Sequence, residues 1–151
     1  MAARGREARQ LLWKLSDSTR HLRQRQKLTP EAALGRRGED LAHRYLRSKG
    51  WTILARNYRP SGAEAEVDIV ARDGEIVVFV EVKSRASAEF AAPERAIDAE
   101  KQKYISRAAR AYAARAGLAW NQVRFDTISV VFTKPPSLMH QQDAFFEGRA
   151  V

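Results

Sequence analysis

Residues 29–50 carry the pattern of an amphipathic helix. Thr29 can cap its first turn, Pro30 fits the first helical position, and Gly50 can end the helix. Apolar side chains recur every three to four residues along one face: Leu34, Leu41, Ala42, Tyr45 and Leu46. Basic side chains occupy the other side: Arg36, Arg37, Arg44 and Arg47. We therefore expect one face of this helix to pack against the protein and the other to be basic.

Three strand patterns follow this helix. Residues 51–59 read as the first strand, residues 66–72 as the second, and a third strand begins after Asp73-Gly74. The third strand has the sequence IVVFVEVKSR at residues 76–85 and is apolar on both faces. This pattern is typical of a central strand that is covered on both sides.

The second half of the chain predicts one more helix and one more strand. The helix covers about residues 93–116 and ends at Gly117, and the strand covers about residues 123–132. A crossover of helical length predicts that this last strand pairs in parallel with an earlier one. The expected fold is therefore α/β, with the order α-β-β-β-α-β and a mixed sheet of four or five strands flanked by helices.

The turn at Asp73-Gly74 predicts how the second and third strands align. A two-residue hairpin loop at this dipeptide fixes the register and places Glu66 directly opposite Glu81. Asp68 then lies diagonal to Glu81, and Lys83 emerges on the same face because strand side chains alternate. The sequence thus predicts three acids and one lysine on a single face of the sheet.

This face is predicted to hold a divalent cation. The carboxylates of Asp68 and Glu81 are close enough to share one ion, and hard oxygen ligands of this kind suit Mg²⁺ or Mn²⁺. The backbone carbonyl of Val82 and the carboxylate of Glu66 are further candidate ligands. Lys83 is placed to orient an attacking water or to stabilise charge that develops on a phosphate.

An ordinary salt bridge between Glu81 and Lys83 is the alternative interpretation. A lone Glu-x-Lys pair on a strand arises easily by chance. Asp68 and Glu66 favour the cation site, since a surplus of buried negative charge is a costly structural device but is normal where a cation binds.

The first helix offers one more acid. At 100° per residue, Glu39 lies at the border of the apolar stripe, whereas Asp40 points into the basic face. We therefore expect Glu39, and not Asp40, to look toward the sheet.

The net charge of +9 favours a polyanionic partner, with nucleic acid ahead of a membrane surface or an acidic protein. Residues 1–30 hold eight Lys or Arg against two acids, whereas the rest of the chain holds 19 against 16. We expect a flexible basic arm at residues 1–30, an α/β domain at 31–133 and a tail at 134–151 that packs partly on the domain. The arm is either a solvated tail or a segment that grips DNA.

Several basic side chains outside the arm are candidates for contacts with DNA. They lie on the first helix, at strand ends and at the start of the second helix: Arg36, Arg37, Arg56, Arg59, Arg85, Lys101 and Lys103. A solvated helix face is the alternative for the two lysines.

Other classes of function have no support in the sequence. Cysteine is absent, the longest apolar stretch is too short to span a bilayer, and neither a P-loop nor a GxGxxG motif is present. We expect a cytoplasmic protein with no membrane partner and no nucleotide cofactor. The three histidines have no metal-ligand spacing and are interpreted as surface or helix residues: His21, His43 and His140. Asp126 is expected to pair with Arg124 or another cation.

Three separated segments resemble the YraN-like family: GRRGEDLAHRYLRSKGWTILARNYR, EVDIVARDGEIVVFVEVKSR and RFDTISVVF. The likeness covers about residues 31–146. It implies the restriction-endonuclease-like core that is shared with Holliday-junction resolvases. Within that resemblance, Asp68, Glu81 and Lys83 match the Asp and Glu-x-Lys signature, and Glu39 matches the glutamate of the helix.

The resemblance and the cation site together predict a Mg²⁺-dependent or Mn²⁺-dependent DNA endonuclease that hydrolyses phosphodiesters, on branched or otherwise structured DNA. Analogy with the same superfamily suggests a homodimer. The alternative is a non-catalytic DNA-binding or scaffold protein that recruits DNA-processing partners.

Overall fold

The structure, a computed structural model, describes residues 28–62, 66–87 and 99–145. The elements follow one another along the chain in this order: α2 (Pro30–Ser48), β1 (Thr52–Tyr58), β2 (Val67–Asp73), β3 (Ile76–Arg85), α3 (Ala99–Ala116), the 3-10 turn η1 (Trp120–Gln122), β4 (Val123–Val131) and β5 (Ser137–Gln141). Contacts divide the chain into two units, residues 1–33 and 34–151, and the first is described only from residue 28. The predicted basic arm therefore lies almost entirely outside the described residues and stays a prediction.

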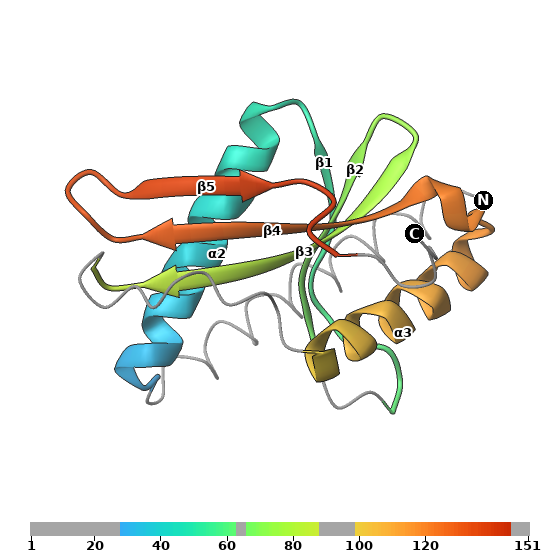
Figure 1. Ribbon diagram of the computed structural model, residues 1–151, viewed down its shortest axis with the longest axis horizontal. Helices are drawn as coiled ribbons and strands as arrows, with labels where there is room; N and C mark the ends of the chain where they lie inside the picture. Colours follow the sequence, from blue (N-terminus) through green and yellow to red (C-terminus); the bar gives the residue numbers. More distant parts are fainter. Residues whose placement is uncertain (1–27, 63–65, 88–98, 146–151) are drawn as a thin grey trace, which may run out of the picture. The chain divides into compact units, whose positions relative to one another are not determined.

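The five strands form one mixed sheet in the order β1-β2-β3-β4-β5 (Figure 1). β3 pairs antiparallel with β2 and parallel with β4, which confirms the predicted crossover. The α/β fold with a mixed sheet between helices is thus confirmed, and its order agrees with a restriction-endonuclease-like core. β5 is a further antiparallel strand, formed from residues that the sequence analysis assigned to the tail. None of the helices in the described part of the chain is long and apolar enough to cross a membrane.

Helix α2 begins and ends at the residues that the sequence indicates. The hydroxyl of Thr29 accepts a hydrogen bond of 3.1 Å from the backbone N–H of Ala32, which caps the first turn. At the other end, Gly50 adopts a φ of +86°, and the N–H of Trp51 returns to the carbonyl of Leu46. This turn directs the chain from α2 into β1.

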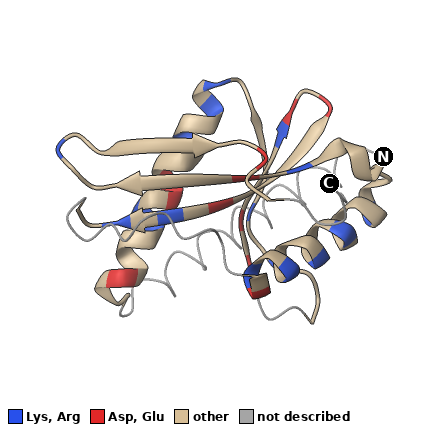
Figure 2. Ribbon diagram, viewed as in Figure 1, with Lys and Arg blue, Asp and Glu red and all other residues tan. Residues whose placement is uncertain are grey.

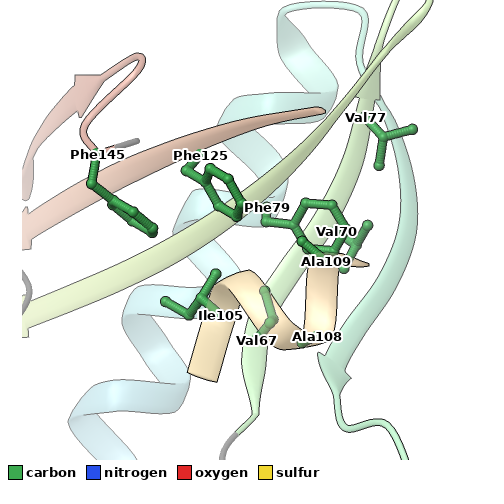
Figure 3. Close-up of a cluster of buried hydrophobic side chains, with 9 residues drawn as sticks. All are labelled: Val67, Val70, Val77, Phe79, Ile105, Ala108, Ala109, Phe125 and Phe145. Atoms are coloured by element: carbon green, nitrogen blue, oxygen red, sulfur yellow. The ribbon is translucent and has the colours of Figure 1, made fainter. Parts of the chain in front are cut away.

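The two faces of the sheet carry separate hydrophobic cores. Val77 and Phe79 of β3 belong to the core that contains α3 side chains, and Figure 3 shows this cluster with Ile105 of α3. Val78 and Val80 belong to the core that contains α2 side chains. Since neighbouring strand residues point to opposite faces, α2 and α3 cover opposite sides of the sheet.

The tail contributes to the core beside α3. Phe145 is buried and stacks on Phe125 of β4 with ring centroids 4.8 Å apart. The backbone N–H of Ala144 also donates to the carbonyl of Phe125. The chain after β5 therefore returns across the sheet to the α3 side.

The predicted register between β2 and β3 is wrong by two residues. Asp73 pairs with Ile76 and Ile69 pairs with Val80, so the hairpin loop consists of Gly74 and Glu75. Gly74 has a φ of +60° at the first central position, which is the place of glycine in a type II′ turn. A shift of two residues leaves every side chain on its predicted face. The predicted pairing of Glu66 with Glu81 is lost, but the shared face of Asp68 and Glu81 survives.

Helix α2 lies close against β3 at Gly38. A β-carbon added there would lie 1.7 Å from Oγ and 3.0 Å from Cβ of Ser84, whereas one added at Gly35 of the same helix meets nothing within 4 Å. Glycine is thus required at position 38 because the β3 side chain occupies the space that a larger residue needs.

Substitution of these two glycines is expected to have opposite effects on stability. Gly38→Ala should lower the free energy of unfolding by about 1–3 kcal/mol through overpacking against Ser84, and adding Ser84→Ala should recover part of the loss. Gly35→Ala should raise it by up to about 1 kcal/mol through helix propensity. Urea unfolding of the variants measures both changes, and equal stabilisation by the two alanines would contradict the close contact.

Candidate functional site

The centre of the candidate site is Glu81 on β3. Its side chain is only 8% exposed. It lies on the central strand of the sheet, which pairs with β2 on one side and with β4 on the other. Because side chains alternate along the strand, Glu81 and the half-buried Lys83 lie on the face of Phe79, which packs with α3. The predicted shared face of the glutamate and the lysine is therefore present.

Asp68 joins this site from β2 through a backbone contact. The last pair of the β2–β3 ladder is Ile69 with Val80, and just beyond it the Oδ2 atom of Asp68 accepts a hydrogen bond of 2.8 Å from the N–H of Val82. The carboxylate thus takes the place of a strand carbonyl where the two strands separate. This bond holds Asp68 beside the glutamate of β3.

The electrostatics of Glu81 indicate a surplus of negative charge. Burial, together with the nearby charge of Asp68, raises the pKa of Glu81 to about 8, although Lys101 acts in the opposite direction. One oxygen, Oε1, lies 2.6 Å from Nζ of Lys101 in α3. The other oxygen, Oε2, is buried and has no hydrogen-bond partner among the described residues. A buried carboxylate oxygen without a partner, next to a second carboxylate, fits the oxygen ligands that Mg²⁺ or Mn²⁺ prefers.

Glu39 approaches the same carboxylates from α2. Its side chain is 20% exposed against 47% for Asp40, so Glu39 is the more buried of the two, but both acids contact Arg56 of β1 and the expectation that Asp40 points away from the sheet is wrong. Burial and the charge of Asp68 raise the pKa of Glu39, while Arg56 at 3.6 Å lowers it. Arg56 also contacts Asp40 at 2.8 Å. Glu39 is therefore near enough to Asp68 to interact electrostatically.

Of the acids predicted as ligands, the structure brings Asp68 and Glu81 together, and their role in metal binding stays a prediction. Across residues 28–62, 66–87 and 99–145, no three histidine, aspartate or glutamate side chains gather into a group that could hold a metal ion. Glu66 forms an ion pair of 3.1 Å with Arg59. The part of Val82 that the structure brings to the site is its N–H, and a role for its carbonyl stays a prediction.

The predicted DNA-binding residues fall into two groups. Arg56 and Arg59 are held in ion pairs with acids, Lys101 binds Glu81, and the guanidinium of Arg37 lies over the ring of Phe132 at 4.5 Å. The others are exposed or half-buried basic side chains: Arg36, Arg85 and Lys103. Contact of any of them with DNA stays a prediction.

Sequence reasoning missed the buried network around Asp126. This residue pairs with Arg124 as expected, but it also lies 2.8 Å from Nε2 of His140, whose Nδ1 lies 3.3 Å from the hydroxyl of Tyr45. The interpretation of His140 as a surface or helix residue is wrong, because its side chain is 4% exposed in β5. No local motif indicates this contact, since the residues come from three distant segments.

The contact between Lys101 and Glu81 was missed as well. Lys101 was a candidate only for DNA binding, because the sequence did not show that the first turn of α3 lies against the middle of β3. The available signal was the surplus of acids on the face of Glu81, which calls for a cation from another element.

Comparisons with known proteins place these residues in a family. The model of the "Uncharacterised protein family UPF0102" matches residues 38–130, which include Glu39, Asp68, Glu81 and Lys83. A UPF0102 protein of Solibacter usitatus is 50% identical over 74% of this chain and 84% of its own length. Relatives from Geobacter sulfurreducens and Rhodococcus jostii are 46% and 39% identical over 74% and 75% of this chain, and over 88% and 96% of their own lengths. The chain belongs to the UPF0102 family, the YraN-like proteins.

Proposed function

We propose that the protein is a metal-dependent nuclease that hydrolyses phosphodiester bonds in DNA. The observation that carries the proposal is the buried Oε2 of Glu81, to which no nitrogen or hydroxyl group among the described residues donates and which shares its site with the carboxylate of Asp68. A structural salt bridge would satisfy the carboxylate on both oxygens, whereas a cation site leaves oxygen lone pairs available.

Each residue of the site has a distinct role in this proposal. Asp68 and Glu81 hold Mg²⁺ or Mn²⁺, and the N–H of Val82 fixes the orientation of the Asp68 carboxylate. The bound cation would polarise a phosphate oxygen and lower the pKa of a bound water. Lys83 lies on the same face and stabilises the negative charge that develops on the phosphate. Glu39 adds negative charge near Asp68 and completes the surroundings of the cation.

The outer face of α3 supports a nucleic-acid substrate. Figure 2 shows Lys and Arg on successive turns of this helix. Lys103 and Arg107 are exposed, and among the described residues neither forms an ion pair with an acidic side chain. Basic groups of this kind bind phosphates without reading the sequence, so the protein would recognise the shape of DNA. Branched or otherwise structured DNA is the substrate that we propose.

The nuclease proposal is tested by cleavage assays with a matched lysine variant. Linear duplex, single-stranded and four-way DNA are incubated with the wild type in Mg²⁺, in Mn²⁺ and in chelator. Cleavage is expected only with the metals. Lys83→Met should lower its rate about 100-fold, because charge stabilisation by one positioned donor is worth that much.

The control is Lys134→Met, which removes an exposed lysine from the loop between β4 and β5 and should cut at the wild-type rate. Cleavage that continues undiminished in Lys83→Met would show that another protein or another site cuts the DNA. If no metal and no DNA supports cleavage by the wild type, the nuclease proposal is refuted.

A non-catalytic DNA-binding protein is the second candidate. Two observations favour it. The ammonium of Lys101 already contacts the carboxylate of Glu81, and the described residues offer no third acidic ligand beside Asp68 and Glu81. This candidate predicts metal-independent binding to the same DNA substrates without cleavage. Gel-shift measurements in chelator, made beside the cleavage assay, distinguish the two functions.

A further inference from the structure

The first turn of α3 brings an ammonium group to the candidate metal site. Nζ of Lys101 lies 2.6 Å from Oε1 of Glu81. The lysine side chain is 40% exposed, whereas that of Glu81 is 8% exposed. The buried acid thus receives its positive charge from a side chain that reaches in from the solvent.

Lys101 and a divalent cation need the same carboxylate. A lysine ammonium is a compact point charge on a flexible four-carbon stem, so it can contact a carboxylate without enclosing it. A cation bound by Asp68 and Glu81 would stand next to this ammonium, and the two positive charges would repel each other in a partly dry site. Lys101 can withdraw at low cost because much of its side chain is already in solvent.

One ammonium does not balance the acids of the site. Asp68 places a second carboxylate beside Glu81, held there by the N–H of Val82. A divalent cation supplies the positive charge that the lysine alone cannot. The exchange of one for the other is therefore favoured by the charges that the structure places here.

We propose that Lys101 is the counter-ion of Glu81 in the metal-free protein and moves to a phosphate of the substrate when a divalent cation binds. This inference rests on the proposed nuclease function. Lys103 and Arg107 are exposed basic residues of the same helix, so the released ammonium adds a further positive charge to an element that already carries charges able to attract phosphates. The lysine offsets part of the negative charge of the site before the metal arrives and binds the substrate afterwards.

The inference predicts effects of opposite sign on two affinities. Lys101→Met removes the competitor but keeps most of the apolar stem, so Mn²⁺ should bind about fivefold more tightly in isothermal titration calorimetry. The same variant should bind a fluorescein-labelled four-way DNA more weakly in Ca²⁺, a cation that also prefers oxygen ligands. Lys101→Arg retains the charge and should stay near the wild type in Mn²⁺ affinity.

A variant on the same helix separates this role from general basic charge. Lys103→Met should weaken DNA binding while leaving the affinity for Mn²⁺ unchanged. Circular dichroism establishes that all variants are folded.

The possible outcomes distinguish this inference from the proposed function. Tighter Mn²⁺ binding with weaker DNA binding in Lys101→Met supports the exchange. Equal or weaker Mn²⁺ binding in Lys101→Met, while the wild type binds Mn²⁺, overturns the exchange and leaves the nuclease proposal standing. Absence of Mn²⁺ binding in both proteins overturns both.

Discussion

Glu81→Gln is expected to make the metal-free protein more stable at pH 8 and at the same time to abolish Mn²⁺ binding. The carboxylate is buried beside Asp68, and its pKa is raised to about 8. Replacement of a poorly compensated buried charge by a neutral group of equal size should raise the free energy of unfolding by about 1–4 kcal/mol. Lys101 loses its contact with the carboxylate, but its side chain is 40% exposed and its ammonium can be hydrated.

The sign of the effect follows from the two protonation states of Glu81. Its pKa is higher in the folded protein than in the unfolded chain, so the folded state binds the proton more tightly. Stability from this group is therefore fully present below the unfolded pKa, near 4.5, and is lost as the pH rises toward about 8. The advantage of Glu81→Gln should accordingly be small at pH 4.5 and largest at pH 8.

Urea unfolding in chelator at the two pH values measures this difference, and calorimetry with Mn²⁺ measures the lost binding. Glu75→Gln is the control, since that glutamate is exposed in the hairpin loop. It should change neither quantity. A Glu81→Gln protein that is less stable than the wild type at pH 8 would show that the carboxylate is a structural group, which would count against a cation site.

Asp126→Ala is expected to cause the largest loss of stability. Asp126 is fully buried and accepts two hydrogen bonds from Arg124, at 2.9 and 3.0 Å. Its Oδ2 atom also lies 2.8 Å from Nε2 of His140, and its Oδ1 atom accepts a hydrogen bond from the backbone N–H of Asp143. Its removal leaves the mostly buried guanidinium of Arg124 with its longer contact to Asp73, at 3.4 Å, and leaves His140 with the hydroxyl of Tyr45, which should cost about 3–5 kcal/mol.

The pH dependence of this network runs opposite to that of Glu81. Burial acts to raise the pKa of Asp126, but its bonds with His140 and Arg124 outweigh burial and lower the pKa. The carboxylate thus contributes stability above its unfolded pKa, about 3.9, which is lost as the pH falls through the lower folded value.

Denaturant unfolding of Asp126→Ala at pH 7 measures the loss. Asp40→Ala serves as the comparison, because Asp40 pairs with Arg56 on the surface and should cost less than about 1 kcal/mol. Similar losses in the two variants would contradict the importance that we assign to burial of the Asp126 network.

The shared face of Asp68 and Glu81 was predictable from the sequence in spite of the wrong register. The glycine at position 74 selects a loop one residue later than the Asp-Gly dipeptide suggested, which shifts the pairing by two residues. A shift of two preserves the face of every strand residue, whereas a shift of one would have reversed it. Because strand side chains alternate with a period of two residues, the predicted face of Asp68 and Glu81 is correct although the predicted register is wrong.

The partners of the acids were not predictable in the same way. Lys101 reaches Glu81 because of where α3 begins relative to β3, and His140 reaches Asp126 because β5 adds a strand beside β4. Both contacts depend on how separate elements pack. Local propensity and hydrophobic period contain no information about such packing.

The hydrogen bond between Asp68 and the N–H of Val82 gives the site its own spectroscopic reporter. The amide proton of Val82 is donated to a carboxylate and not to a strand carbonyl, although the residue lies in the middle of the sheet. Its resonance and its rate of exchange with deuterium must therefore respond to the charge on Asp68, while the neighbouring amides of β3 report the integrity of the sheet. Nuclear magnetic resonance of this single backbone proton would follow ion binding even in variants that have lost all activity.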